Sequence, residues 1–341
     1  MTRILVTGAA GFIGFHLGRL LLESGHDVVG FDGLTPYYDT ALKHERLAQL
    51  QRFGTFRFVE GMLEDAALLR RTVSEARPEI VVHLAAQAGV RYSLEAPQSY
   101  IQSNVVGTAN LLEALRAHPV RHLLFASTSS VYGGNTKLPF VETDLADHPV
   151  SLYAATKKSG EAMVHSYAHL FGIASTAVRF FTVYGPYGRP DMAAIKFADA
   201  MLSGRSIDVY GYGRMRRDFT YVDDLVASIS ALLDVVPVQG QGVAGDSLSA
   251  VAPYRVVNIG GGAPSELMDF IAALEEALGV KAELNLLPMQ PGDVVATFAD
   301  TSLLNTLVPG LSHTPMREGV RRFADRYKPR HGMAAGSLST R

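Results

Sequence analysis

A glycine-rich turn near the start of the sequence constrains the fold more than any other feature. The apolar run at 4–6 leads into Gly8, Gly11 and Gly14, and apolar residues at helical spacing follow over 12–24. In such a turn the first glycine permits the tight bend, the second lets backbone approach a pyrophosphate, and the third lets the helix pack closely on the sheet. The helix N-terminus then offers free N–H groups and a positive dipole to phosphate. The turn therefore predicts a dinucleotide-binding unit.

Asp32 indicates which dinucleotide the turn would bind. It ends the second predicted strand, 18 residues after Gly14, where an acid that binds the adenosine ribose is expected. Its negative charge disfavours a 2′-phosphate, so NAD is predicted rather than NADP. The alternatives are an ordinary turn between a strand and a helix, and a capping or surface Asp. The combination of strand, glycines, helix and acid favours the cofactor site over both.

The pattern of apolar segments predicts an α/β fold with a Rossmann-like, doubly wound parallel sheet. Strands and helices alternate through the first half, and residues 80–82 are apolar without a break, as in strands buried on both faces. After Phe181 the alternation loosens, which predicts a smaller, mixed α/β C-terminal substrate domain. Strands are predicted at 3–7, 27–31, 56–60, 80–84, 122–126 and 176–181, and helices at 12–24, 150–171, 193–202, 223–233, 265–278 and 316–326.

Two domains and two less regular segments follow from this pattern. Residues 1–181 are predicted to form the NAD-binding Rossmann domain, with returning segments near 220–260. A loop over 237–253 is expected to be exposed, because it is rich in Gly, Ser and Ala. The substrate domain is assigned to 182–219 and 261–328, and a loose tail to 329–341.

Composition narrows the class of protein. The 341 residues are 48% hydrophobic, enough for a packed core, and 31 Lys plus Arg nearly balance 33 Asp plus Glu. The net charge of −2 argues against coating nucleic acid or an anionic membrane, since both need a basic surface. The absence of Cys excludes disulfides, thiolate metal sites and a Cys nucleophile. Because no apolar stretch suits a secretion signal or a membrane span, a cytoplasmic protein is predicted.

Tyr153 and Lys157 form the strongest candidate catalytic pair. Four residues apart on a predicted helix, they share one face, and the Lys cation is expected to lower the pKa of the phenol toward neutrality. Such a phenolate can take an alcohol proton while a hydride leaves the same carbon. The spacing alone is common on protein surfaces. Here, however, a predicted strand ends in the hydroxyl run 127–130, and a doubly wound sheet places its chemistry at that end of its strands.

These motifs resemble those of the extended short-chain dehydrogenase/reductase superfamily, in its branch of nucleotide-sugar epimerases and dehydratases. The resemblance runs from about residue 3 to residue 327 and is greatest to the UDP-glucuronate 4-epimerases. It implies reversible C4 epimerisation of UDP-glucuronate to UDP-galacturonate through a 4-keto intermediate, with bound NAD reduced and reoxidised in each cycle. A homodimer is also implied. The matching segments are 85–93, 151–158, 179–186, 188–193 and 216–224.

The resemblance also implies roles for individual residues. Thr128, Tyr153 and Lys157 match the family's catalytic residues, and Thr182 would face the sugar carboxylate because neutral-sugar epimerases carry Asn there. Met62 departs from the family, since many relatives carry Asp near the adenine. The cofactor site is predicted to comprise Gly8, Gly11, Phe12, Ile13, Gly14, Asp32, Leu84, Ala85, Ala86, Asn104, Tyr153, Lys157 and Phe181. The substrate site is predicted to comprise Arg91, Ser129, Ser130, Thr182, Arg189, Arg217 and Asp293.

Several alternative functions can be compared on particular residues. UDP-glucuronate decarboxylases usually carry Thr-Ser-Glu at the hydroxyl run and 4,6-dehydratases Thr-Asp-Glu, whereas this chain has Thr-Ser-Ser at 128–130. Thr182 argues against a UDP-glucose/galactose 4-epimerase. A non-catalytic dinucleotide sensor could lose the Tyr–Lys pair, which is present here. His165 and His169 have a spacing seen in metal sites, but no third ligand is apparent, so no metal is predicted.

Overall fold

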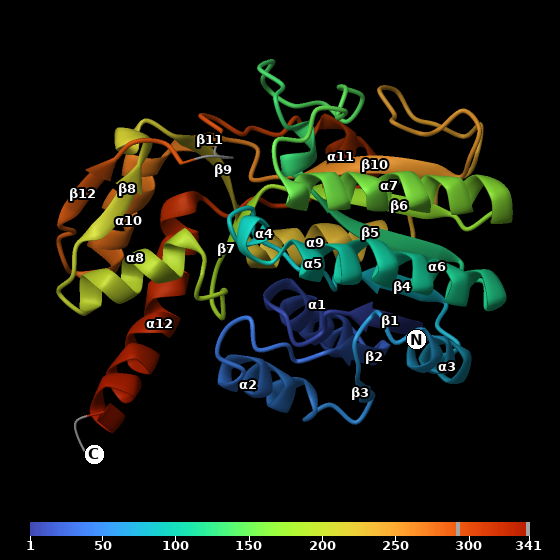
Figure 1. The fold of residues 1–341 in the computed structure, drawn as a ribbon, viewed down its shortest axis with the longest axis horizontal. Helices are drawn as coiled ribbons and strands as arrows, with labels where there is room; N and C mark the ends of the chain where they lie inside the picture. The colour runs from blue at the N-terminus through green and yellow to red at the C-terminus, as the bar shows by residue number, and fades with distance from the viewer. Residues whose placement is uncertain (291–293, 339–341) are drawn as a thin grey trace.

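The computed structural model of the protein describes residues 1–290 and 294–338. Its larger lobe is built on a seven-stranded sheet in the order β10-β6-β5-β4-β1-β2-β3, and every neighbouring pair is parallel. This is the predicted doubly wound α/β sheet (Figure 1). Its strands are β1 (Arg3–Thr7), β2 (Asp27–Asp32), β3 (Phe56–Glu60), β4 (Ile80–His83), β5 (His122–Thr128), β6 (Ser175–Phe180) and β10 (Tyr254–Ile259).

Helices cover both faces of this sheet, and each face has its own apolar core. Alternate residues of one strand enter different cores: Ile4 and Val6 of β1 face one side, and Leu5 faces the other. The first core includes residues of α1 (Phe12–Glu23), α2 (Ala41–Leu50), α9 (Val222–Leu232) and α11 (Ser302–Leu307). The second includes residues of α3 (Ala66–Ala76), α6 (Gly107–Ala117) and α7 (Leu152–Phe171).

A smaller lobe packs around a third apolar core, at the left of Figure 1. Two short sheets belong to it, in the orders β11-β9-β7 and β12-β8. This mixed α/β arrangement matches the predicted class of the C-terminal part. Its elements are β7 (Thr182–Tyr184), α8 (Ala193–Leu202), β8 (Ile207–Tyr210), β9 (Arg216–Tyr221), β11 (Pro264–Glu266), α10 (Leu267–Leu278), β12 (Leu284–Leu287) and α12 (Met316–Leu338). The shorter helical segments of the chain are α4 (Tyr92–Glu95), α5 (Pro97–Tyr100), η1 (Ile101–Val106), η2 (Ser129–Tyr132) and η3 (Gly211–Gly213).

The C-terminal segment differs from the sequence prediction. A loose tail was expected from residue 329, but α12 continues through Pro329 to Leu338. The composition of this segment does not distinguish a terminal helix from an irregular tail, because neither requires a pattern of apolar residues that pack into a core. Within the part of the chain that the structure describes, no helix is long and apolar enough to cross a membrane.

The predicted loop over 237–253 contains no helix or strand, yet its contacts hold it in place. Asp246 forms a buried ion pair with Arg255 of β10 at 2.8 Å. The imidazole of His165 lies 2.8 Å from the Ser249 hydroxyl, and that of His169 lies 2.6 Å from the Val251 carbonyl oxygen. The two histidines with metal-like spacing therefore hold this loop against α7.

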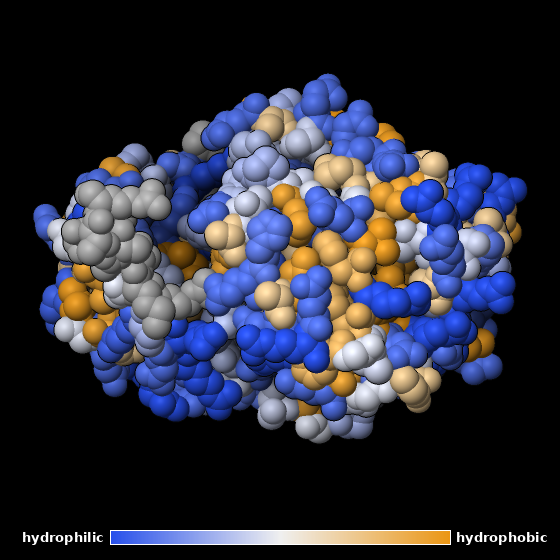
Figure 2. Space-filling view, turned by 90° about the horizontal axis from the view of Figure 1, so that it is seen from below, coloured by the Kyte–Doolittle hydropathy of each residue, from blue (hydrophilic) through white to orange (hydrophobic). Residues whose placement is uncertain are grey.

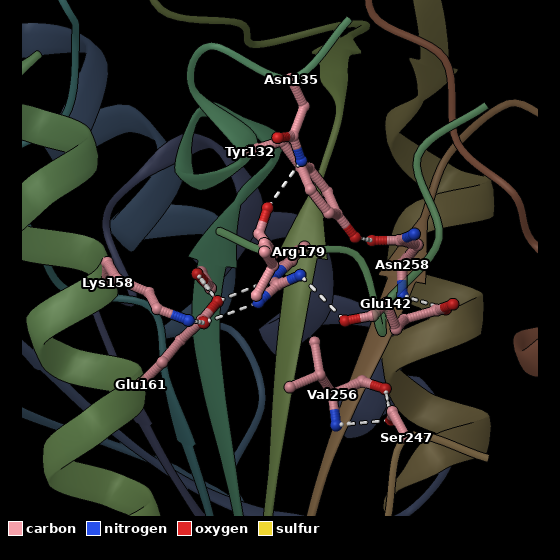
Figure 3. Close-up of polar contacts among 11 residues, drawn as sticks. Tyr132, Asn135, Glu142, Lys158, Glu161, Arg179, Ser247, Val256 and Asn258 are labelled. Atoms are coloured by element: carbon pink, nitrogen blue, oxygen red, sulfur yellow. Dashed lines mark hydrogen bonds and ion pairs between the residues drawn. The ribbon is translucent and has the colours of Figure 1, made fainter. Parts of the chain in front are cut away.

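A buried ion pair connects α7 to the sheet near the end of β5 (Figure 3). Arg179 of β6 donates two hydrogen bonds of 2.8 Å to the carboxylate of Glu161, and both side chains are only 3% exposed. Ser127 of β5 donates to the same carboxylate at 2.6 Å. Arg179 also donates to the main-chain oxygen of Glu142 at 3.3 Å. One carboxylate thus holds two strands and a helix together.

The ion pair predicts a large loss of stability for Glu161→Gln, because that change leaves a buried guanidinium without a compensating charge. Breaking one partner of a buried pair typically costs about 3–5 kcal/mol. In the exposed pair between Arg317 and Glu276, Glu276→Gln should cost less than about 1 kcal/mol. Urea unfolding of both variants measures the difference. Equal costs would show that the buried pair is not an anchor of the fold.

Candidate active site

The glycine-rich turn has the close packing that its sequence predicts. Gly8 has a φ of 74°, in the left-handed region that favours glycine, and its amide donates to Phe31 at 2.7 Å. A Cβ on Gly14 would lie 2.1 Å from the Gly8 oxygen, far inside contact distance. Gly11 is the N-cap of α1, so the first turn of that helix begins directly at the bend.

Asp32 is tied to the same turn by its side chain. One carboxylate oxygen accepts from the Ala10 amide at 3.0 Å, and the other accepts from the Leu34 amide at 2.9 Å. Each carboxylate oxygen has a further lone pair for a ligand hydroxyl. Both Asp32 and the turn line a cavity of about 390 Å³. The predicted cofactor residues on its wall are Gly8, Gly11, Phe12, Ile13, Gly14, Asp32, Leu84, Ala85, Ala86, Tyr153, Lys157 and Phe181.

Asn104 lies behind the wall of this cavity rather than on it. Its buried side chain accepts from the Gln87 amide at 2.8 Å and donates to the Gln87 oxygen at 3.0 Å. It also donates to the Thr156 hydroxyl at 3.0 Å. Asn104 therefore supports the segment after β4 that forms the wall, and the sequence did not distinguish such support from direct contact.

The three candidate catalytic residues line the same cavity from two elements. Thr128 is the last residue of β5. Tyr153 and Lys157 lie in the first turns of α7, whose start is fixed by Ser151, because the Ser151 hydroxyl accepts from the Ala154 amide at 3.1 Å. Ser127 and Glu161 anchor the two elements to each other, so the three side chains have a rigid support.

The electrostatics of the pair differ from the sequence prediction. Desolvation in the cavity wall raises the pKa of Tyr153, while a hydrogen bond with Thr128 and the charge of Arg189 act in the opposite direction. Burial lowers the pKa of Lys157 to about 8, and the nearby carboxylate of Glu161 opposes that change. The pKa of Tyr153 thus changes in the direction opposite to the lowering that is expected from the Lys157 cation.

A second, larger cavity of about 1510 Å³ lies beside the first and extends into the smaller lobe. The predicted substrate residues divide between the two. Ser129 and Ser130 line the first cavity only, Arg91 and Arg217 line the second only, and Thr182 and Arg189 border both. Asp293 lies outside the described residues. Tyr153 also borders both cavities, so the candidate base stands where they meet.

Other residues of the site escaped the sequence analysis. Tyr37 follows Asp32 in the chain and borders both cavities, and its hydroxyl donates to Asp191 at 3.0 Å. Arg46 of α2 is fully buried and donates to the Ala10 oxygen at 3.0 Å. Both residues follow Asp32 in the sequence, within the segment between the second and third predicted strands. Neither belongs to a motif of known spacing, so the sequence does not single them out.

These observations fit a dinucleotide in the smaller cavity. The turn leaves no space for side chains at Gly8 and Gly14, so main chain forms the floor beside the start of α1. Such main-chain N–H groups at a helix start suit a pyrophosphate. The wall of this cavity also includes the Asp32 carboxylate, which suits ribose hydroxyls, and the polar side chains of Tyr153 and Lys157.

Comparison with known proteins agrees with this arrangement. Residues 4–245 match the NAD dependent epimerase/dehydratase family. A probable UDP-glucuronate 4-epimerase of Rhizobium meliloti is 56% identical over 329 residues, covering 95% of this chain and 96% of that protein. UDP-glucuronate 4-epimerase 4 of Arabidopsis thaliana is 44% identical, covering 95% and 75%. The crystal structure of UDP-glucuronic acid 4-epimerase from Bacillus cereus with UDP-glucuronic acid and NAD gives a TM-score of 0.85 at 35% identity, covering 96% and 99%.

The packing of the turn predicts that Gly14→Ala destabilises the protein and weakens NAD binding, because the new methyl group would displace main chain. Overpacking of this kind costs about 1–3 kcal/mol. Gly54→Ala is the matched control, since a Cβ there meets no atom of the described chain within 4 Å. Thermal unfolding and calorimetry with NAD measure both effects. Equal behaviour of the two variants would contradict a tightly packed turn.

Proposed function

The chain belongs to the NAD dependent epimerase/dehydratase family, and from this premise we propose that it interconverts UDP-glucuronate and UDP-galacturonate by inverting C4. NAD is its cofactor. The observation that carries the proposal is the meeting of two cavities at Tyr153, beside the hydroxyl run that ends β5. One cavity suits the dinucleotide and the other the nucleotide sugar, so the reacting carbon would lie within reach of both.

The cofactor residues are proposed to act together in holding NAD. The glycine turn and the start of α1 receive the pyrophosphate, and Asp32 binds the adenosine ribose. Lys157 holds the second ribose, where its buried ammonium group has a ligand hydroxyl as acceptor. When bound, NAD supplies the acceptor and later the donor of the C4 hydride.

The residues of the chain handle the proton and the sugar. Tyr153 takes the C4 hydroxyl proton, and Thr128 hydrogen-bonds the C4 oxygen and orients it. Arg217 and Arg189 are proposed to hold the diphosphate end, because a guanidinium offers a planar fork to phosphate oxygens. With that end anchored, the 4-keto sugar turns over and presents its other face. Tyr153 then returns the proton, so the net change is inversion at one carbon.

The carboxylate of the sugar needs a restraint of its own. The 4-keto form of a glucuronate is a β-keto acid, which loses CO2 when its C–carboxylate bond stands perpendicular to the carbonyl plane. Ser129, Ser130 and Thr182 are proposed to hold the carboxylate away from that geometry. Ser130 is already oriented, since its amide donates to the Thr128 hydroxyl at 3.2 Å. Ser130 also argues against a decarboxylase or a dehydratase, because those enzymes usually carry Glu at this position.

The domain assignment, the assembly and the compartment are further parts of the proposal. Residues 1–181, with returning segments near 220–260, are assigned to NAD, and 182–219 with 261–328 to the UDP-sugar. We propose a homodimer in the cytoplasm. Large apolar side chains on α4 and α7 support a protein contact, since Leu94 is 69% exposed and Leu170 is 63% exposed. Hydrophobic residues also gather in a band on the face shown in Figure 2.

Product analysis tests the proposed reaction most directly. Purified protein is incubated with UDP-glucuronate and no added NAD, and the products are identified by NMR. UDP-galacturonate is the expected product, and formation of a UDP-4-keto-pentose as the main product would instead assign a decarboxylase. An inactive protein that binds NAD but changes no UDP-sugar would favour the sensor.

Tyr153→Phe should abolish turnover while leaving NAD bound, because it removes the proposed base and little packing. A loss of at least about 10²-fold is expected for a general base. Bound NAD is measured after denaturation of the purified variant. Substantial residual turnover would place the base elsewhere.

Thr182→Val and Ser130→Ala should slow epimerisation and raise the fraction of UDP-4-keto-pentose and CO2. A hydrogen bond to a charged group is worth about 1.5–3 kcal/mol, enough to change the partition between products tenfold or more. Thr306→Val, on the surface of α11, serves as a control. Product NMR decides the matter. If both variants only slow down, Arg189 or main-chain N–H groups restrain the carboxylate instead.

A further inference from the structure

The segment 187–191 of the smaller lobe is fastened to the cofactor side by Arg46. This guanidinium donates to the Tyr187 oxygen at 2.7 Å and to the Gly188 oxygen at 3.3 Å. Its other nitrogen donates to the Ala10 oxygen in the glycine turn at 3.0 Å. One fully buried side chain therefore connects the cofactor turn to the start of this segment.

A second contact between the lobes lies at the other end of the segment. The hydroxyl of Tyr37 donates to the carboxylate of Asp191 at 3.0 Å. That carboxylate also accepts from Arg189, at 3.0 Å from Nε and 2.5 Å from Nη2. Arg189 in turn donates to the Ala88 oxygen at 3.3 Å. The contact thus ties the loop after β2 and the loop after β4 to the smaller lobe.

The surroundings of Tyr37 show that this contact is closely packed. The Arg189 guanidinium lies 5.6 Å from the centre of the Tyr37 ring, and Tyr92 lies against the same ring at 4.6 Å. A Cβ on Gly89 would lie 3.3 Å from the Tyr37 hydroxyl. Burial and the charge of Asp191 raise the pKa of Tyr37 to about 12, so the phenol keeps its proton and remains a donor at neutral pH.

We propose that Tyr37 and Asp191 form a clasp that retains NAD, with Tyr37 as a positioning residue; this inference rests on the proposed function. Tyr37, Arg189 and Met192 line the cofactor cavity, so its wall is made by both lobes. Separation of the parts of this wall would widen the path by which a bound dinucleotide leaves. Opening separates the loop after β2 from the segment 187–191, and the hydrogen bond from Tyr37 to Asp191 must then break.

The test measures release of NAD rather than turnover. Wild-type protein and Tyr37→Phe, both loaded with NAD, are diluted, and the NAD that passes a filter is assayed over time. A hydrogen bond to a charged acceptor corresponds to roughly ten- to a hundredfold faster release. Tyr167→Phe is the matched control, since its hydroxyl also donates to a carboxylate, that of Glu113, and neither residue lines either cavity. It should release NAD within about threefold of wild type.

A second variant keeps the test decisive if one substitution disturbs the fold. Asp191→Asn should also speed release, and adding Tyr37→Phe to it should change the rate little further, because the two groups share one interaction. Affinity for UDP, measured by calorimetry, should change less than NAD release in Tyr37→Phe.

Several results would overturn the clasp. Release from Tyr37→Phe within twofold of wild type, or equally fast release from Tyr167→Phe, would do so while leaving the proposed function intact. A loss confined to UDP affinity would make Tyr37 a support for Arg189 alone. Wild-type protein unable to bind NAD would overturn both the clasp and the proposed function.

Discussion

The arrangement of the site depends on the buried pair of Glu161 and Arg179. The Arg179 guanidinium on β6 is only 3% exposed, so it needs a compensating negative charge. Glu161 on α7 supplies that charge. The same carboxylate accepts from Ser127, next to Thr128. Because Glu161 lies one helical turn beyond Lys157, the pair sets the position of the Tyr–Lys face relative to the hydroxyl run. The positions of the candidate catalytic residues therefore depend on the neutralisation of the buried Arg179 charge by Glu161.

The burial that fixes Tyr153 and Lys157 in place also disfavours their charged forms. The pKa of Lys157 falls to about 8 and that of Tyr153 rises, so both groups are shifted toward their neutral forms. Glu161 partly restores the Lys157 cation, and Arg189 and Thr128 partly favour the phenolate. A nicotinamide cation bound beside Tyr153, as in the proposed function, would add to the effects of Arg189 and Thr128.

Local patterns predicted the sheet well, whereas long-range contacts of the site were not predictable. The glycine spacing, Asp32 and the apolar runs depend on neighbours in the chain, and the structure has the parallel sheet they imply. Position in a motif does not say on which side of a wall a side chain lies, and the bonds of Asn104 to Gln87 and Thr156 are visible only in the structure. Tyr37 and Asp191 are 154 residues apart, so only the folded lobes bring them together.

The two cavities differ in a way that suits their proposed ligands. In the proposed reaction NAD is regenerated in every cycle and does not need to leave, so contacts that hold it in its cavity of about 390 Å³ would not slow turnover. The sugar nucleotide would have to enter, turn over and leave each time, and the neighbouring cavity is larger, at about 1510 Å³. Tyr37 and Arg189 border both cavities, so in the proposed function a single wall would contact the cofactor on one side and the substrate on the other.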